Sequence, residues 1–329
     1  MDSPIFYLQW HITHACNLRC RHCYQAEYQS HMPRGTLFRA LDAFDELLEG
    51  RGVQGQINLT GGEPLLHPDF FDLAGEIRRR GYRPGVLTNG TLIDRQTAAR
   101  LAALEPVFVQ VSLDGTREIH DAIRGPGAFR QALDGIDRLK EQGVRVLVSF
   151  TAQKSNCASF PALARVCREH RVDKLWWDRV VTETPEQMRA LAVSTAQFRR
   201  LVAVTNRRRR AARRRGEQPM VSNGRALQFC PSVDEPSYRC SAGKNLLVLL
   251  ADGSLMPCRR LPFIIGDLDK GGLREQLEAS PLMRELAQPL VPAGCAGCRL
   301  LLRCGGGARC VTYARTGRLD LRDVNCFRR

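Results

Sequence analysis

Cysteines constrain this chain more than any other residue type. Thirteen of its 329 residues are cysteines, with three between residues 16 and 23 and eight in the last hundred residues. The N-terminus lacks a secretory signal pattern, and no apolar run reaches about 18 residues, so we expect a cytoplasmic protein without a membrane segment. Disulfides are rare in that compartment, and the sequence therefore predicts that the thiols ligate metal or take part in catalysis.

The overall composition is that of a folded protein with an anionic partner. Hydrophobic residues make up 43% of the chain and charged residues 25%, which is close to the globular average. An intrinsically disordered chain is thereby excluded. The 49 basic and 34 acidic residues give a net charge of +15, which favours nucleic acid, an acidic peptide or a polycarboxylate substrate without choosing among them.

Strand-like apolar runs alternate with helical patterns through the first two thirds of the chain. The expected strands cover residues 6–13, 56–60, 84–88, 108–115, 144–150 and 174–181. This alternation favours right-handed βαβ units and a parallel sheet. Six such strands can form an open barrel, so we expect an α/β fold with a partial TIM-like (β/α)6 barrel. Its functional groups should lie on the loops that follow the strands.

The pattern changes after an arginine-rich segment. Residues 186–215 are expected to form one long helix. A hairpin with its turn at Asp252-Gly253 and a helix over residues 273–288 follow, and the rest is loop spaced by cysteines. Bound metal would supply much of the folding energy of such a segment. The expected domains are a barrel that includes the arginine-rich helix and a cysteine-rich domain: residues 1–215 and 216–329.

The first three cysteines, Cys16, Cys20 and Cys23, directly follow the first expected strand. Three thiolates would therefore converge on one loop at the mouth of the barrel. Structural zinc usually takes four ligands, and no fourth cysteine or well-placed histidine lies near in the sequence. Three thiolates suit a four-iron cluster that keeps one iron open for a small molecule. A zinc site or a structural thiol cluster is the alternative.

Two segments of the barrel carry a family resemblance. The sequence CNLRCRHC at residues 16–23 resembles the signature of the radical S-adenosylmethionine (SAM) enzymes, and TGGEP at residues 60–64 resembles their Gly-Gly-Glu-Pro motif. The resemblance implies that a four-iron cluster on Cys16, Cys20 and Cys23 cleaves SAM. Glycines without a Cβ let backbone carbonyls approach the amine of SAM, and Glu63 can form an ion pair with that amine.

Further SAM-binding groups are expected where the strands end. The resemblance implies that Ser112 and Arg124 contact the SAM carboxylate, and that His22 occupies the place of an aromatic side chain near adenine. Asn89 and Asp114 could hold a ribose or a carboxylate. A solvated surface position is the alternative for Arg124. The complete expected set is His22, Gly61, Gly62, Glu63, Asn89, Ser112, Asp114 and Arg124.

The C-terminal cysteines resemble the SPASM domain, which binds two auxiliary four-iron clusters in radical enzymes that modify peptides and proteins. The resemblance implies two interleaved ligand sets, and hence three 4Fe-4S clusters in the chain. The sets are Cys230, Cys240, Cys258 and Cys310, and Cys295, Cys298, Cys304 and Cys326. The family spacing would place a cysteine where Ala308 stands, and the glycines before it could absorb the two extra residues that lead to Cys310. A zinc ribbon is the alternative for Cys295 and Cys298.

Together the resemblances imply an oxidoreductase that cleaves SAM to a 5′-deoxyadenosyl radical and oxidatively modifies its substrate. Anaerobic sulfatase maturases carry a base aspartate directly after the cysteine that matches Cys258. Here Arg259 and Arg260 follow it, which argues against sulfatase maturation. We expect the maturation of a ribosomally made peptide (RiPP maturation). Modification of tetrapyrrole side chains is the alternative, and a metal-stapled nucleic-acid-binding protein is a third reading that leaves the barrel motifs unexplained.

The expected partners follow from this interpretation. They are a peptide or small-protein substrate, an electron donor such as flavodoxin or ferredoxin, and a separate leader-binding protein, because the first strand begins by residue 6. Neither a membrane nor nucleic acid is expected. Seven arginines between residues 207 and 215 would surround a helix end. A solvated helix end is the default interpretation, and docking of an acidic leader peptide or its carrier is the alternative.

Overall fold

The computed structural model describes residues 4–25, 27–216, 219–223 and 240–328. Its strands are β1 (Ile5–His11), β2 (Gln54–Thr60), β3 (Pro84–Thr88), β4 (Phe108–Ser112), β5 (Val146–Ala152), β6 (Lys174–Arg179), β7 (Met220–Asn223), β8 (Leu246–Leu249), β9 (Ser254–Met256) and β10 (Gly266–Asp267). Its α-helices are α1 (Arg34–Leu48), α2 (Phe70–Arg79), α3 (Arg95–Ala103), α4 (Arg117–Arg124), α5 (Ala128–Glu141), α6 (Phe160–Glu169), α7 (Pro185–Leu191), α8 (Thr195–Arg215), α9 (Leu273–Ala279), α10 (Pro281–Ala287), α11 (Leu301–Cys304) and α12 (Arg309–Thr316).

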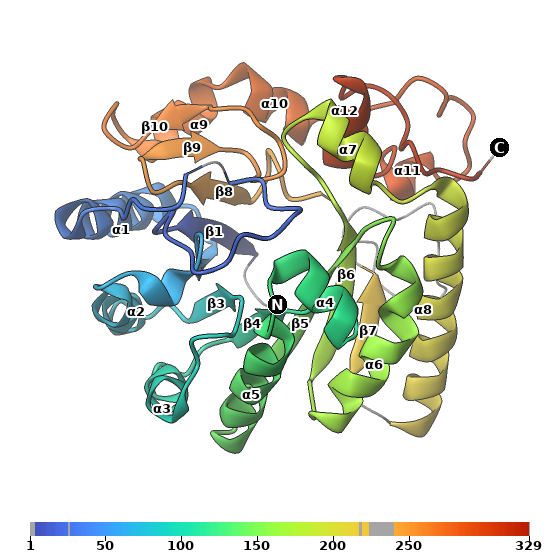
Figure 1. The fold of residues 1–329 in the computed structure, drawn as a ribbon. Coiled ribbons are helices and arrows are strands. Elements are labelled where there is room, and N and C mark those ends of the chain that lie inside the picture. Colours follow the sequence, from blue (N-terminus) through green and yellow to red (C-terminus); the bar gives the residue numbers. More distant parts are fainter. Residues whose placement is uncertain (1–3, 26, 217–218, 224–239, 329) are drawn as a thin grey trace.

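All the described strands belong to one sheet in the order β10-β9-β8-β1-β2-β3-β4-β5-β6-β7. Strands β1 to β7 are parallel and adjacent in chain order, so the expected parallel (β/α)6 barrel is confirmed. Helices α1, α2, α3, α5, α6 and α8 follow one another around the outside of the curved sheet (Figure 1). The carboxyl ends of the six central strands therefore open on the same side of the molecule.

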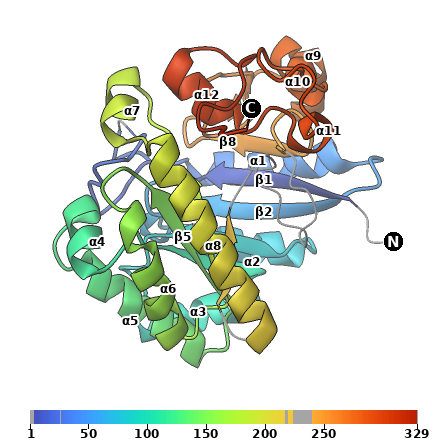
Figure 2. The ribbon, with the colours of Figure 1, turned by 90° about the vertical axis from the view of Figure 1, so that its right-hand side faces the viewer.

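The C-terminal segment extends the barrel sheet. Strand β8 pairs in parallel with β1, and β9 and β10 continue antiparallel beyond it. Figure 2 shows α9, α10 and α12 gathered beside β8 and β1. On the opposite edge β7 pairs with β6, although its residues follow the expected boundary at 215. The division into domains 1–215 and 216–329 stays a prediction, because one continuous sheet runs through both.

Apolar residues on alternate strand positions build the core. Phe6, Leu8 and Trp10 on β1 are buried, and Ile57 and Leu59 on β2 are buried beside them. Helix α1 adds one apolar stripe at three- and four-residue spacing. That stripe consists of Leu37, Ala40, Leu41, Phe44 and Leu47. Because the sheet is covered on this face, the backbone at the strand ends is fixed and can position functional groups.

The expectation of one long helix over residues 186–215 is wrong. Helix α7 ends at Leu191 and α8 begins at Thr195. Between them, the Ser194 hydroxyl accepts a hydrogen bond from the Gln197 N–H, and the Gln197 side chain accepts one from the Ser194 N–H. This reciprocal cap starts a new helix.

The helix expected over residues 273–288 is also two helices, α9 and α10. Pro281 lacks an N–H group, and the Ser280 side chain caps α10 by accepting a hydrogen bond from Met283 N–H. The hairpin expected at Asp252-Gly253 is confirmed, since β8 and β9 are antiparallel around that turn. Among the described residues, no helix is both long enough and apolar enough to cross a membrane.

Candidate active site

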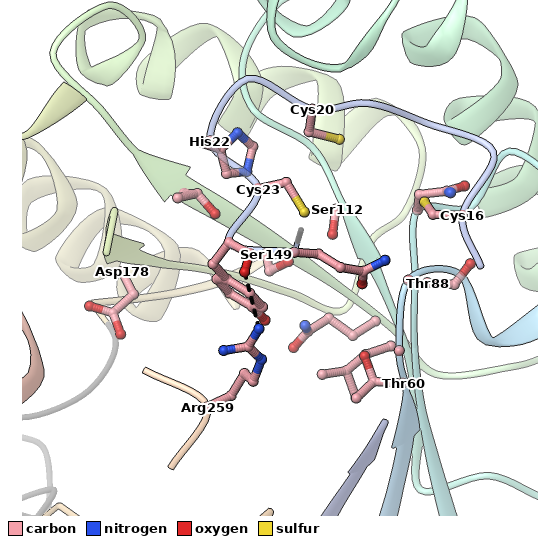
Figure 3. Close-up of a pocket in the computed structure, with 18 of the residues that line it drawn as sticks. Cys16, Cys20, His22, Cys23, Thr60, Thr88, Ser112, Ser149, Asp178 and Arg259 are labelled. Carbon is pink, nitrogen blue, oxygen red and sulfur yellow. Dashed lines mark hydrogen bonds between the residues drawn. The ribbon is translucent and has the colours of Figure 1, made fainter. Parts of the chain in front are cut away.

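A cavity of about 280 Å³ lies at the carboxyl ends of the parallel strands. Thr60, Thr88, Ser112 and Asp178 reach it from the ends of β2, β3, β4 and β6 (Figure 3). The loop after β1 and the segment after β9 close it from two further sides. The loops at the expected end of the barrel thus line a cavity, and the function of their side chains stays a prediction.

Cys16, Cys20 and Cys23 all line this cavity, and all three are free thiols. Burial raises the pKa of Cys16 to about 11, and the nearby charges of Glu63, Cys20 and Cys23 add to the effect. Burial also raises the pKa of Cys20, whereas Arg124 lowers it. Three neighbouring buried thiolates thus need a strongly cationic partner, which an iron–sulfur cluster provides.

The thiols fit a cluster better than a single ion. In the described part of the chain, no three His, Cys, Asp or Glu side chains are arranged to hold one metal ion. Each thiolate of a four-iron cluster binds a different iron, so the sulfur atoms do not need to meet at one point. The donor set therefore fits the expected group, and its ligation by Cys16, Cys20 and Cys23 stays a prediction.

Gly61 and Gly62 hold the cysteine loop against the end of β2. A Cβ on Gly61 would lie 2.3 Å from the Thr13 carbonyl oxygen, and one on Gly62 would lie 2.3 Å from the Ala15 carbonyl oxygen. The Gly62 N–H donates to the Thr13 carbonyl at 2.8 Å. Both glycines line the cavity, and their approach to SAM stays a prediction. Their first structural effect is a close approach between two backbone segments.

Glu63 lies behind the wall of the cavity. Its buried carboxylate accepts hydrogen bonds from the Thr88 hydroxyl and the Asn89 N–H, both at 2.7 Å. Burial raises its pKa to about 7, although these hydrogen bonds oppose the shift. Thr88 and Asn89 line the cavity themselves. Glu63 thus orients two groups that can contact a ligand, and its own ion pair with the SAM amine stays a prediction.

Arg124 and Asp114 form a buried ion pair beside the cysteines. Arg124 Nε donates to Asp114 Oδ2 at 2.7 Å, and Arg124 Nη1 lies 3.8 Å from Cys20 Sγ. Burial alone would raise the pKa of Asp114, but Arg124 and His22 hold it below its usual value. The alternative of a solvated surface arginine is wrong, because Arg124 is buried and lines the cavity.

His22 is enclosed between this ion pair and the cavity. Its Nε2 lies 3.6 Å from Asp114 Oδ2, and burial lowers the pKa of the imidazole to about 4. The ring is therefore neutral near pH 7 and lines the cavity, as a stacking partner would. Among the described residues, its Nδ1 has no hydrogen-bond partner.

Several cavity residues were missed in the sequence analysis, among them Ser149 and Trp176, which lie beside the expected Ser112. Ser112, Ser149 and Trp176 lie side by side in the register of β4, β5 and β6. Trp176 Nε1 donates to Gln110 Oε1 at 3.0 Å, and Gln9 on β1 lines the same space. The strands of a parallel sheet are otherwise buried on both faces. Polar residues inside them are therefore the sequence signal that could have revealed this wall of the cavity.

The segment after β9 brings arginines to the cavity. Arg259 Nη2 donates to the Tyr24 carbonyl at 3.1 Å. Arg260 forms an ion pair with Asp178 and donates to the Arg179 carbonyl at 2.7 Å. Both side chains line the cavity, so residues from the two ends of the chain enclose one space.

The second expected set of C-terminal thiols gathers in one place. Burial raises the pKa of Cys295, with Cys298 and Cys326 as further causes. Burial likewise raises the pKa of Cys304 to about 11, and Cys326 and Cys295 again contribute. Thiols that perturb one another in this way are neighbours. Their ligation of an auxiliary cluster stays a prediction.

The first expected set is described in part. Cys258 and Cys310 contact the same small apolar cluster, which also contains Leu261. Cys240 is exposed. Cys230 lies outside the described residues, so its expected role stays a prediction.

Residues 10–152 match the family model of the radical SAM superfamily. The chain therefore contains a radical SAM domain. It is similar to the mycofactocin maturase MftC of Mycobacterium ulcerans (strain Agy99), with 29% identity over 344 residues that cover 99% of this chain and 88% of the relative. It is also similar to the Fe-coproporphyrin III synthase of Methanosarcina barkeri (strain Fusaro / DSM 804), with 36% identity over 177 residues that cover 52% of this chain and 43% of that protein.

Two solved structures share the fold over nearly the whole chain. Streptococcus suis SuiB bound to S-adenosylmethionine has a TM-score of 0.78 at 20% identity and covers 99% of this chain and 78% of its own. Native anSMEcpe with bound AdoMet has a TM-score of 0.82 at 19% identity, covering 98% of this chain and 94% of its own. These likenesses confirm the expected α/β barrel fold together with its cysteine-rich C-terminal segment.

Proposed function

We propose that this enzyme is a peptide maturase that cleaves SAM and oxidatively modifies a peptide or small protein. The observation that carries the proposal is the single cavity in which the three-cysteine loop meets arginines of the C-terminal segment. A four-iron cluster bound by that loop would supply the electron that splits SAM into methionine and a 5′-deoxyadenosyl radical. A reducing compartment such as the cytoplasm suits these thiols.

Residues of the chain would bind and orient SAM in this cavity. Ser112 and Arg124 would hold its carboxylate, and Asn89, which Glu63 holds in place, would contact its polar groups. His22 would stack beside adenine, because it is neutral and enclosed. The enclosure keeps water away from a reactive radical.

The relatives support a peptide as the substrate. MftC is named a maturase, and SuiB has been solved bound to the precursor peptide SuiA. Native anSMEcpe has been solved with AdoMet and the Cp18Cys peptide. For this chain we propose the same class of substrate, together with a low-potential electron donor and a separate leader-binding protein.

Iron content and SAM cleavage test the radical chemistry. Two C-terminal thiol sets and the N-terminal set predict about twelve irons per chain after anaerobic reconstitution. Replacing Cys16, Cys20 and Cys23 together with Ala should remove about four irons and abolish 5′-deoxyadenosine formation, measured by chromatography with a chemical reductant. The control is Cys157→Ala, since Cys157 lies outside all three sets. SAM cleavage by the triple variant would refute the assignment.

Co-expression tests the substrate. Short open reading frames beside the gene would be expressed with and without the enzyme, and each peptide would be weighed by mass spectrometry. A mass change that requires Cys16, Cys20 and Cys23 is expected. If every neighbouring peptide keeps its mass, peptide maturation loses its support.

Tetrapyrrole modification is the second candidate. Fe-coproporphyrin III synthase has a higher sequence identity to this chain than MftC has, although the match covers only 43% of that synthase. Incubation with iron coproporphyrin III, SAM and reductant would change the mass of the porphyrin if this candidate holds. We expect no change.

A further inference from the structure

We propose that Arg259 binds a carboxylate of the substrate at the side of the cavity opposite the three-cysteine loop. The inference deepens the proposed function, since it takes this cavity as the substrate site. In Figure 3, Arg259 lies on one side of the cavity, and Cys20 and Cys23 lie on the other. A group held by Arg259 would therefore place its neighbouring atoms between the arginine and the SAM-binding end.

The guanidinium of Arg259 is held in a fixed position. Its side chain is 15% exposed, its Cζ lies 4.2 Å from the centroid of the Tyr24 ring, and its Nη2 donates to the Tyr24 carbonyl. Stacking and the backbone hydrogen bond fix the plane of the side chain. An arginine that is already ordered loses little entropy when it binds a ligand.

Arg259 differs from the other arginines of the cavity in its ion pairing. Arg124 and Arg179 have carboxylate oxygens at 2.7 and 2.6 Å, and Arg260 forms a close pair with Asp178. Among the described residues, the one carboxylate paired with Arg259 is that of Glu183, at 3.6 Å.

The Glu183 carboxylate is also too exposed to neutralise Arg259 well. Its side chain is 46% exposed, so the pair is weak and partly screened by solvent. A substrate carboxylate could approach the guanidinium more closely and accept two hydrogen bonds from its fork.

The charge around the cavity agrees with this assignment. Four arginines line it, and Asp178 is the one aspartate among the described lining residues, which include no glutamate. The field of Arg259 also reaches His11, whose pKa is lowered to about 3 by burial, by Arg259 and by His14. Because Arg124, Arg179 and Arg260 are closely paired, an anionic group that entered this space would meet the least neutralised positive charge at Arg259.

Synthetic peptide pools test the inference without a known substrate. Four pools of acetylated heptapeptides would be prepared, each with one fixed Glu or Gln and with either a free or an amidated C-terminus. Each pool would be offered to the reconstituted, SAM-loaded enzyme. Affinity selection and mass spectrometry would measure the retained fraction. We expect at least about tenfold higher retention of an acidic pool than of the Gln-amide pool. The Glu and free C-terminus pools distinguish a side-chain carboxylate from a terminal one.

Arg259→Gln should reduce that preference to less than about threefold, and Arg259→Lys should restore part of it, because Lys keeps the charge without the fork. The matched control is Arg130→Gln, which changes an exposed arginine on α5 and should keep the full preference. SAM binding by every variant verifies folding. Equal retention of all pools by the unaltered enzyme, or an unchanged preference in Arg259→Gln, excludes a peptide carboxylate as the ligand of Arg259, and it overturns the inference if the porphyrin arm below also shows no dependence on Arg259.

A porphyrin arm separates this inference from the proposed function. Binding of iron coproporphyrin III would be compared with that of its tetramethyl ester by absorbance. If only the porphyrin shows binding that depends on its carboxylates and on Arg259, the carboxylate site stands and peptide maturation falls. If neither probe depends on Arg259, the carboxylate site falls regardless of the substrate class.

Discussion

At the scale of single residues, the Gly61-Gly62-Glu63 segment after β2 shapes the cavity. Its glycines have no side chain, and Glu63 holds neighbouring groups in place. Gly62 allows the backbone of the cysteine loop to approach, and Glu63 binds Thr88 and Asn89 at the end of the next strand. One short segment thus connects three strand ends. Substitutions in this segment should weaken ligand binding more than they destabilise the fold.

Gly62→Ala should displace the cysteine loop. The new Cβ would overlap the Ala15 carbonyl oxygen, and overpacking of this kind costs about 1–3 kcal/mol. We expect a lower melting temperature and at least about tenfold weaker SAM binding by calorimetry. Gly75→Ala is the control, because a Cβ at Gly75 on α2 would meet nothing within 4 Å. Equal behaviour of the two variants would show that the close approach at Gly62 is unimportant.

Glu63→Gln should weaken SAM binding and change its pH dependence. The raised pKa of about 7 means that Glu63 loses its proton as the pH rises through neutrality. If the carboxylate pairs with the SAM amine, SAM affinity should increase from about pH 6 to about pH 8. The Gln variant should bind at least about tenfold more weakly at the upper pH, without this increase.

Glu118→Gln on α4 is the control for this experiment, because Glu118 is exposed and should leave both affinity and pH profile unchanged. A flat profile in the unaltered enzyme would restrict Glu63 to holding Thr88 and Asn89.

At the scale of elements, helix α8 has a packed N-terminal half and an arginine-rich C-terminal half. Phe198 and Leu201 are buried, and Trp177 Nε1 donates to Thr205 Oγ1 at 2.8 Å. The arginine-rich half ends just before Met220, which pairs with Lys174 at the start of β6. The run therefore lies at the end of the sheet away from the cavity. Burial lowers the pKa of Arg208, and the like charges of Arg165 and Arg168 lower it further.

Neutralising Arg207, Arg208, Arg209 and Arg210 with Gln should leave substrate-independent SAM cleavage intact, because the cavity is distant. We propose that the run attracts an acidic leader peptide or its carrier. The variant should then show a higher apparent KM for the substrate and a weaker dependence of KM on salt from about 50 to about 500 mM. Single substitutions should have little effect, since exposed charge contacts are individually weak.

A matched fourfold change on other helices controls for net charge. It replaces Arg78, Arg79, Arg95 and Arg130 with Gln and should keep the KM of the unaltered enzyme. If both fourfold variants process substrate equally across the salt series, the run on α8 is a solvated helix end.

At the scale of the whole molecule, one buried ion pair joins the barrel to the C-terminal segment. Both Nη atoms of Arg179 on β6 donate to the Asp323 carboxylate, at 2.6 and 2.7 Å. Asp323 also accepts the Ala308 N–H at 2.8 Å, and the Cys326 N–H donates to its carbonyl at 2.9 Å. The pair therefore positions the loops that carry the second expected thiol set.

Asp323→Asn should destabilise the protein by about 3–5 kcal/mol near neutral pH, because it leaves the Arg179 charge buried and unpaired. Burial alone would raise the pKa of Asp323, but Arg179 lowers it. A carboxyl with a lowered folded pKa stabilises the fold above its unfolded pKa and loses this effect as the pH falls through the folded value. The difference between the variant and the unaltered protein should therefore shrink below about pH 4. Denaturant unfolding at several pH values measures it.

Asp320→Asn is the control for this prediction, because Asp320 pairs with Arg318 on the surface of the same segment, where both side chains are more than half exposed. Its melting temperature should hardly change. A similarly small effect of Asp323→Asn would mean that the two segments are joined mainly by the sheet.

The sequence by itself determined the radical SAM domain, the six strands of its parallel barrel and the strand ends at which the cavity lies. Periodicity identified the six barrel strands, and the cysteine spacing with the Gly-Gly-Glu-Pro segment marked the loops where the site lies. Both are local features, because they depend on neighbours within a few residues. The two divided helices were also readable, since Ser194 with Gln197 and Ser280 with Pro281 are local start signals that the longer apolar pattern obscured.

Only the tertiary structure decided which side chains meet. Arg259 reaches Tyr24 because β8 joins the sheet beside β1, and this contact joins residues 235 positions apart. Likewise, the burial of Arg124 and the hydrogen bonds of Glu63 depend on how separate loops pack at the strand ends. Local patterns cannot determine such contacts. Which distant segments of the chain come together depends on the burial and strand pairing of the whole sheet.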